Sequence, residues 1–465
     1  MRTVFWGLVS GFFLFGMNIE QRAYSAEPSL EQHVIILSID GLAATYLNDP
    51  RAKLPNLRKL MKVGAYAEGM ETIFPSVTWP AHVSIVTGAS PAKHGVISNS
   101  VLDRKTLERI TYIGDPVFTK DQAVRVPTLY DAAHQQGMIT AAIIWPACNG
   151  ARTLNFVIPD SNKQEIHNKY TTPGLSDELY NNNISIRNLG KWGWDHKVSA
   201  MRDSTYTDVA KYLFKKYEPH LMMMHFITPD GFEHDYGPHC EEAYWACENA
   251  DDRVGELWDA IQASPLKENT TLIIVSDHGF APVLQSINLN VHLRKSGLIT
   301  LDSKKKFETR KAWSNANGGS AGIYILDEEN KEAIRKKLIK SIAKLEGVER
   351  VLDVADFMKY GLPDPKENPQ QADLMIAAKA GYSFSNNHTS DLEVTPVSKT
   401  RRGTHGHLPD ARYMHATLIM AGAGIKPGAK IKVASCLDVA PTAAHLLQIK
   451  MPTAEGRVLH ELLAQ

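Results

Sequence analysis

The stretch Val34-Ile35-Ile36-Leu37-Ser38-Ile39-Asp40-Gly41 is an apolar run that ends in an aspartate and a glycine. A continuous run of this length is typical of a strand buried on both faces of a parallel sheet. More runs of this kind lie further along the chain, at residues 140–145, 221–227, 272–275 and 416–421. Helical patterns separate the runs, at residues 54–63, 128–136, 204–217 and 241–261.

This alternation predicts an α/β fold, in which a mostly parallel central sheet carries helices on both faces. Two segments interrupt it. Residues 148–200 are polar and irregular, and we expect an insertion there. Residues 285–400 contain strand patterns at 320–326 and 372–377 and a charged helical pattern at 328–344, which together predict a smaller inserted α+β lobe. The core then comprises residues 27–284 and 401–465.

The first 26 residues have the pattern of a secretory signal peptide. Arg2 precedes an apolar run at residues 4–17, which is too short to span a bilayer comfortably, and Ala23-Tyr24-Ser25-Ala26 offers small residues for cleavage. An uncleaved membrane anchor is the alternative. We expect cleavage, which leaves a secreted or periplasmic protein with no stable membrane span.

Composition narrows the range of partners. The 465 residues include 51 basic and 51 acidic side chains, so the chain has no charge excess for binding duplex nucleic acid or anionic membranes. No feature of the sequence indicates a protein partner. The cysteines allow zero to two disulfides whose pairing stays open, and they are Cys148, Cys240, Cys247 and Cys436. Cys240 and Cys247 would lie about 10 Å apart on one helix, too far to bond.

Acidic and imidazole side chains follow several of the predicted strands. The set comprises Asp40, Asp230, His234, Asp277, His278 and His405. In an open parallel sheet, ligands bind beyond the carboxyl ends of the strands, so we expect these side chains to converge. Imidazole and carboxylate together suit zinc, whereas magnesium and calcium rarely take three histidines. The sequence therefore predicts a site for a pair of divalent transition metals.

The segment Phe74-Pro75-Ser76-Val77-Thr78-Trp79-Pro80-Ala81-His82 precedes an apolar helical pattern. Pro80 favours the first turn of that helix, which places the Thr78 hydroxyl beside free backbone N–H groups. A hydroxyl in this position can hold a phosphoryl oxygen, and taken alone it can equally cap the helix.

Six motifs occur in a fixed order, and together they resemble the nucleotide pyrophosphatase/phosphodiesterase family of the alkaline phosphatase superfamily. They are the segment ending Asp40-Gly41, the Thr78 segment, His94-Gly95-Val96-Ile97-Ser98-Asn99, Asp230-Gly231-Phe232-Glu233-His234, Ser276-Asp277-His278-Gly279 and Gly403-Thr404-His405-Gly406. The resemblance covers residues 33–460. It implies an alkaline phosphatase-like core that binds two zinc ions and a small-molecule phosphodiester or nucleotide.

The resemblance also implies a role for each of these residues. Asp230, His234 and His405 would hold one zinc. The second zinc would be held by Asp40, Thr78, Asp277 and His278. Thr78 would be the nucleophile, giving a covalent phospho-threonine intermediate that water hydrolyses. Asn99 would hydrogen-bond a phosphoryl oxygen.

Comparison with sibling families leaves alternatives open. The Cys/Ser-x-Pro-x-Arg pattern of arylsulfatases is absent, and so is the Lys-x-Arg pair that threonine-dependent phosphomonoesterases carry. Trp79 follows the nucleophile where the family often has an aromatic residue that stacks on a nucleobase, but the opposing aromatic is replaced by His225. We therefore predict a zinc-dependent phosphodiesterase or nucleotide pyrophosphatase. The alternatives are a phosphonoacetate hydrolase, a phosphomonoesterase and a non-catalytic binding protein.

Overall fold

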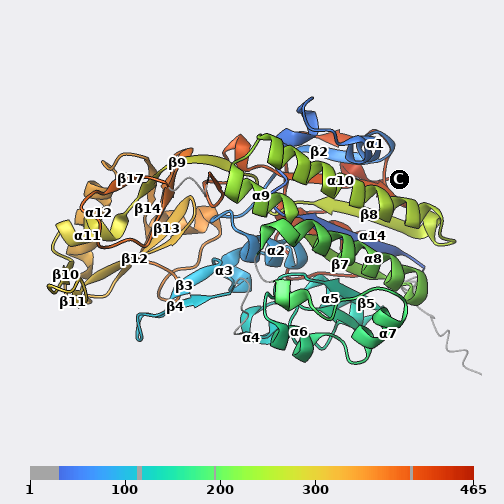
Figure 1. Ribbon diagram of the computed structural model, residues 1–465, viewed down its shortest axis with the longest axis horizontal. Coiled ribbons are helices and arrows are strands. Elements are labelled where there is room, and N and C mark those ends of the chain that lie inside the picture. The colour runs from blue at the N-terminus through green and yellow to red at the C-terminus, as the bar shows by residue number, and fades with distance from the viewer. Residues whose placement is uncertain (1–30, 113–117, 193–194, 398–401, 465) are drawn as a thin grey trace, which may run out of the picture.

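The computed structural model describes residues 31–112, 118–192, 195–397 and 402–464. The predicted signal peptide lies outside these residues. Figure 1 shows a large part built from the N-terminal, middle and C-terminal segments, with a smaller part beside it built from residues after β8. Among the described residues, no helix is both long enough and apolar enough to cross a membrane.

A central sheet of nine strands forms the larger part. Its strands are, in spatial order, β20 (Lys430–Ile431), β2 (Ala65–Glu71), β19 (Ala416–Gly422), β8 (Thr270–Val275), β1 (His33–Ile39), β7 (Leu221–Phe226), β5 (Thr140–Ile143) and β6 (Phe156–Ile158), with β21 (Ala434–Ser435) also paired to β2. Only β19 runs antiparallel to its neighbours. The predicted α/β fold with a mostly parallel sheet is confirmed.

Both faces of this sheet are covered, which explains why β1 is apolar without alternation. Ile35, Leu37 and Ile39 point to one face, where they pack with α1 (Pro55–Val63), α8 (Ser199–Tyr217) and α10 (Glu241–Gln262). Val34 and Ile36 point to the other face, toward α2 (Thr78–Thr87), α5 (Leu129–Gln135) and α14 (Val439–Leu446). Side chains alternate along a strand, so every residue of β1 meets a helix layer.

The segment at 148–200 is less irregular than its polarity suggests. It contains β6, α6 (Gln164–Tyr170) and α7 (Leu175–Asn181), and β6 is the edge strand of the central sheet. The expectation of an irregular insertion is therefore wrong for this part. A strand of three residues is too short to show a periodic pattern in the sequence.

The smaller part contains two further sheets. An antiparallel sheet has the order β12 (Ala312–Asn317), β13 (Ser320–Ile325), β15 (Leu374–Ala378) and β14 (Val348–Leu352). Its strands pack with α12 (Lys331–Ile342) in a hydrophobic cluster of their own, drawn from residues 287–384. The boundaries 285 and 400 of this lobe stay a prediction.

A second small sheet and two hairpins complete the lobe and its border with the core. The strand β9 (Ala281–Ile287) pairs with β16 (Gly381–Phe384), β17 (Val394–Pro396) and β18 (Gly403–Thr404). One hairpin is β10 (Ile299–Leu301) with β11 (Phe307–Arg310), beside α11 (Leu289–Lys295). The other is β3 (Ser100–Leu102) with β4 (Arg109–Thr111), which lies between core and lobe in Figure 1. Short helices α3 (Pro91–His94), α4 (Lys120–Ala123) and α13 (Val354–Phe357) lie in the connections.

The four cysteines are free thiols. Cys240 caps the N-terminus of α10, where its sulfur accepts the N–H of Ala243, and Cys247 is buried about two turns further along that helix. The helical separation of these two residues matches the expectation that they do not bridge.

Candidate active site

Two neighbouring parallel strands bring the first group of polar residues together. Asp40 follows β1, and Asp277 and His278 follow β8, which pairs with β1. His278 Nε2 lies 3.5 Å from Asp40 Oδ1 and 3.1 Å from Asp277 Oδ2. All three side chains are buried. Gly41 permits this convergence, because its φ is +77° and a Cβ there would meet Phe280 at 2.9 Å.

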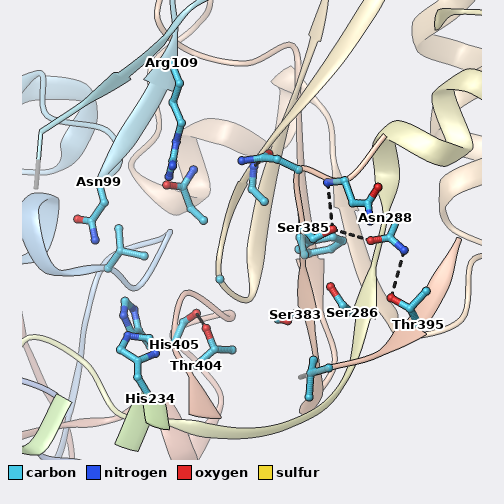
Figure 2. Close-up of a pocket in the computed structure, with 18 of the residues that line it drawn as sticks. Asn99, Arg109, His234, Ser286, Asn288, Ser383, Ser385, Thr395, Thr404 and His405 are labelled. Atoms are coloured by element: carbon cyan, nitrogen blue, oxygen red, sulfur yellow. Dashed lines mark hydrogen bonds between the residues drawn. The ribbon is translucent and has the colours of Figure 1, made fainter. Parts of the chain in front are cut away.

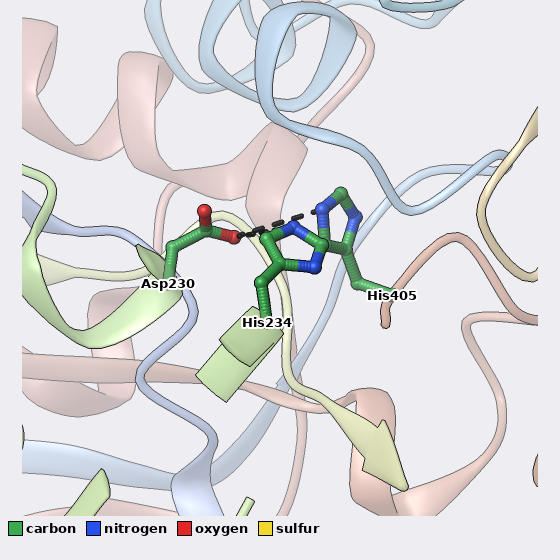
Figure 3. A group of neighbouring side chains, drawn as sticks. All are labelled: Asp230, His234 and His405. Atoms are coloured by element: carbon green, nitrogen blue, oxygen red, sulfur yellow. Dashed lines mark ion pairs between the residues drawn. The ribbon is translucent and has the colours of Figure 1, made fainter. Parts of the chain in front are cut away.

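A second group forms where α9 (Thr228–Tyr236) meets the end of β18. Asp230 and His234 are one helical turn apart on α9, and His405 directly follows β18. Asp230 Oδ1 lies 3.5 Å from His234 Nε2 and 3.6 Å from His405 Nε2, as Figure 3 shows. The ligand-type atoms of this trio lie within 4.8 Å of one another, and so do those of Asp40, Asp230 and His278. Asp230 therefore joins the two groups.

Backbone carbonyls fix the orientation of the three imidazoles. Nδ1 of His234 lies 3.1 Å from the carbonyl oxygen of Gly403, and Nδ1 of His405 lies 3.0 Å from that of Ser76. Nδ1 of His278 lies 3.2 Å from the carbonyl oxygen of Gly279. A ring that donates from Nδ1 presents the lone pair of Nε2, and this arrangement is typical of histidines that bind metals.

The electrostatics of the cluster call for a cation. Burial raises the pKa of Asp40 and Asp277 well above the ordinary value, and their mutual repulsion raises the pKa of Asp277 further. Burial lowers the pKa of His278, and the nearby His405 lowers it again. Asp40 Oδ1, Asp277 Oδ2 and His278 Nε2 are buried with no hydrogen-bond partner among the described residues. Carboxylates so placed are costly unless a positive charge compensates them, and carboxylate with imidazole suits zinc.

Thr78 lies at the first position of α2, beside these two groups. It lines a cavity of about 640 Å³ together with Asn99, Asp230, His234 and His405. Asn99 Oδ1 accepts the backbone N–H of Trp79 at 2.8 Å, which leaves the amide NH₂ as the donor. Figure 2 shows Asn99 beside the cavity, with His234 and His405 below it. The structure thus brings the predicted nucleophile, the predicted phosphoryl-binding amide and the predicted metal ligands together.

The Trp79 and His225 side chains are both buried. The Trp79 side chain is 1% exposed, and its indole N–H donates to Asp160 Oδ2. His225 is 2% exposed, and its Nε2 lies 3.1 Å from Asp40 Oδ2. Neither is among the described residues that line the large cavity. Stacking of a base on Trp79 stays a prediction.

Sequence reasoning named His225 only as the residue that replaces a stacking aromatic, and it missed Arg109. His225 faces Ser38 in the register of β7 with β1, so it supports Asp40 from the neighbouring strand. Its place at the end of an apolar strand was the available signal. Arg109 lines the large cavity from the hairpin β3–β4, and no motif surrounds it.

Comparison with known proteins gives the same family. The sequence profile of the type I phosphodiesterase / nucleotide pyrophosphatase family matches residues 34–408. Human ectonucleotide pyrophosphatase/phosphodiesterase family member 1 is 28% identical over 245 residues, which cover 53% of this chain and 23% of that protein. The human bis(5'-adenosyl)-triphosphatase ENPP4 is 24% identical over 462 residues, which cover 98% of this chain and 85% of that protein.

Solved structures agree in fold. Murine ectonucleotide pyrophosphatase / phosphodiesterase 5 superposes with a TM-score of 0.68 and 20% identity, over 93% of this chain and 100% of that one. An inactive variant of the murine protein, in complex with AMP, superposes with the same TM-score. Because the family profile spans most of the chain, this protein belongs to the type I phosphodiesterase / nucleotide pyrophosphatase family.

Proposed function

We propose that this protein is a zinc-dependent phosphodiesterase or nucleotide pyrophosphatase that cleaves phosphodiester or phosphoanhydride bonds through a covalent intermediate on Thr78. The observation that carries the proposal is that Thr78 and Asn99 line one cavity with the Asp230, His234 and His405 group, to which Asp40 and His278 are joined through Asp230. Family membership supports the reaction class.

The donor set supports two divalent metals. Asp230, His234 and His405 would hold one zinc, and the other would be held by Asp40, Thr78, Asp277 and His278. Bound zinc supplies Lewis-acid chemistry, which acidifies a coordinated hydroxyl and neutralises charge on phosphoryl oxygens.

The protein's own residues then account for the course of the reaction. Thr78 Oγ1, having lost its proton, attacks phosphorus as the bond from phosphorus to the leaving oxygen breaks. The Asn99 NH₂ donates to an equatorial oxygen, where negative charge builds up. Water then attacks phosphorus and breaks its bond to Thr78, so two inversions give net retention. Fixed imidazoles keep the cluster in one geometry.

A paired assay tests this proposal. Zinc-loaded protein is offered the p-nitrophenyl ester of thymidine 5'-monophosphate, p-nitrophenyl phosphate and phosphonoacetate, with Thr78→Ala as the blank. We expect a strong preference for the diester, loss of activity with a chelator, and recovery with zinc. Preference for the monoester or for phosphonoacetate would move the enzyme to a sibling family. Rescue by magnesium alone would contradict the ligand argument.

Export is a further part of the proposal. We propose that residues 1–26 are a signal peptide that is removed on secretion or on transfer to the periplasm. The N-terminal sequence of the protein purified from the exported fraction tests this directly. A mature chain that begins with Met1 would contradict it.

A further inference from the structure

Arg109 is the only lysine or arginine among the described residues that line the large cavity. It is the first residue of β4, at the border between core and lobe. Figure 2 shows its side chain directed into the cavity, on the far side from His234 and His405. The site therefore contains a cation besides any metal that it binds.

A hydrogen bond from one nitrogen, Nε, holds the Arg109 guanidinium in place. Its Nε–H donates to Ser100 Oγ at 2.8 Å, and the Ser100 hydroxyl donates in turn to Asn317 Oδ1 at 2.9 Å. Asn317 Nδ2 donates back to the carbonyl oxygen of Ser100 at 3.3 Å. This chain of hydrogen bonds joins β3 and β4 to β12 of the lobe. The Arg109 side chain is thus oriented before any substrate binds.

The two terminal nitrogens of Arg109 have no hydrogen bond or ion pair with the described residues. Arg104, in the same hairpin, shows the contrast, because its guanidinium lies 2.9 Å from Asp373 and also donates to the carbonyl oxygen of Gln371. A planar fork of free N–H donors matches two oxygens of one phosphate or carboxylate. The guanidinium of Arg104 therefore bonds to other residues of the protein, whereas the terminal N–H groups of Arg109 are available to a ligand in the cavity.

Elsewhere on the lobe side, the described residues that line the cavity carry no charged side chain, and many of them are polar. They include Ser286, Asn288, Ser383, Ser385, Asn386 and Thr395. Several of these groups bond each other, as Ser385 Oγ does to Asn288 Oδ1 and Asn288 Nδ2 does to Thr395 Oγ1. A second negative charge on the substrate would therefore find its partner at Arg109, because the attacked phosphoryl group is already matched by Asn99 and the metal groups.

We propose that Arg109 is a specificity residue that binds a second phosphate, attached to the phosphorus that Thr78 attacks, and so favours phosphoanhydrides over simple diesters. The inference rests on the proposed function and goes beyond it by naming the residue that selects one of its two substrate classes over the other. The Arg109 fork acts on binding of substrate and transition state, and it takes no part in proton or group transfer.

The test compares kcat/KM on diadenosine triphosphate, which carries adjacent phosphates, with that on the p-nitrophenyl ester of thymidine 5'-monophosphate, which carries one. Arg109→Gln is expected to lose about 10- to 100-fold on the triphosphate, as removal of a hydrogen bond to a charged group does, and to change the diester rate little. Arg109→Lys keeps the charge without the fork and should recover part of the loss. Lys105→Gln removes one positive charge from the same hairpin, away from the cavity lining, and should change neither rate.

The remaining outcomes separate failure of this inference from failure of the proposed function. Equal losses on both substrates, or no loss on either, would overturn the inference. A loss confined to phosphonoacetate would assign the fork to a carboxylate and overturn it as well. If the unmodified enzyme cleaved neither nucleotide substrate, the proposed function itself would fail. If it cleaved them in a Thr78-dependent way and the Arg109 variants behaved like the unmodified enzyme, only the inference about Arg109 would fail.

Discussion

His225 contacts the predicted metal ligand Asp40 and is not itself one of the predicted ligands. Its Nε2 lies 3.1 Å from Asp40 Oδ2, and its ring packs on His82 with the centroids 4.4 Å apart. Because Asp40 is buried, this contact fixes which carboxylate oxygen faces His278. Partners of this kind orient metal ligands and tune their basicity.

We expect His225→Ala to lower zinc affinity by about 10- to 100-fold, because Asp40 would lose its orienting contact. Competition with a chromophoric chelator measures this. His33→Ala is the matched control, since it removes a buried histidine from the opposite end of β1. Equal affinity of His225→Ala and the unmodified protein would show that Asp40 is held by other contacts.

At the residue scale, the sequence predicted the side chains that lie in motifs and missed those that reach the site through the fold. Asp40, Asp277 and His278 are recognisable because each follows an apolar strand directly. Arg109 has no such context, because its place at the cavity depends on how the hairpin β3–β4 meets the lobe. Contacts between segments far apart in the chain leave no local pattern.

The element that positions Asp230 and His234 is α9, and its first turn is held by a carboxylate from α8. Asp203 Oδ1 accepts the N–H of Ile227, Asp203 Oδ2 accepts the N–H of Thr228, and the Thr228 hydroxyl also donates to Oδ2. Asp203 is fully buried, and burial raises its pKa to about 6. The start of α9 is thus fixed by a side chain that no motif includes.

Asp203→Ala should lower the free energy of unfolding by about 2–4 kcal/mol, because it leaves buried donors without an acceptor. Asp203→Asn keeps one acceptor oxygen and should cost less. Urea denaturation of both variants measures the difference. A similar stability of Asp203→Ala and the unmodified protein would show that water or a rearranged α9 satisfies these donors.

At the element scale, the long apolar strands and amphipathic helices were predictable, and their ends differ from the prediction by a few residues. The predicted helix at 204–217 begins earlier, at Ser199, and the strand at 272–275 begins at Thr270. The strand β6 escaped prediction because three residues show no period. The antiparallel direction of β19 is a property of chain topology, which hydrophobicity does not encode.

For the molecule as a whole, buried histidines make stability depend on pH. Burial lowers the pKa of His94 to about 3 and that of His167 to about 4. The Val96 N–H donates to His94 Nδ1 at 3.1 Å, so the ring must stay neutral to accept it. In the unfolded chain these rings protonate near pH 6.5. Below that value the unfolded state binds more protons, so stability falls as the pH falls, down to about pH 3 for His94.

We expect each such histidine to lower the free energy of unfolding by up to about 1.4 kcal/mol per pH unit between pH 6.5 and 4. The buried carboxylates whose pKa burial raises, such as Asp203, contribute with the opposite sign. His94→Gln removes the contribution of one histidine and leaves the buried carboxylates unchanged. The difference in pH dependence between the two proteins therefore measures the contribution of His94 alone. Urea denaturation at a series of pH values gives the slopes. Identical slopes would mean that His94 does not stay neutral in the folded state.

The whole fold places the cavity between the core, which supplies Thr78 and the predicted metal ligands Asp230, His234 and His405, and the lobe, whose described lining residues carry no charged side chain. The sequence predicted both parts, but it did not predict how they meet. The substrate preference therefore depends on the feature that is least accessible to sequence patterns.

The proposed function requires that Thr78 form a covalent intermediate with the substrate phosphorus. Its most direct test is acid quenching of the zinc-loaded enzyme within the first turnover of the p-nitrophenyl ester of thymidine 5'-monophosphate, followed by peptide mass spectrometry. We expect one nucleotidyl group on the peptide that contains Thr78, a burst of p-nitrophenolate, and neither signal from folded Thr78→Ala. An adduct on a different residue, or full turnover by Thr78→Ala, would contradict it.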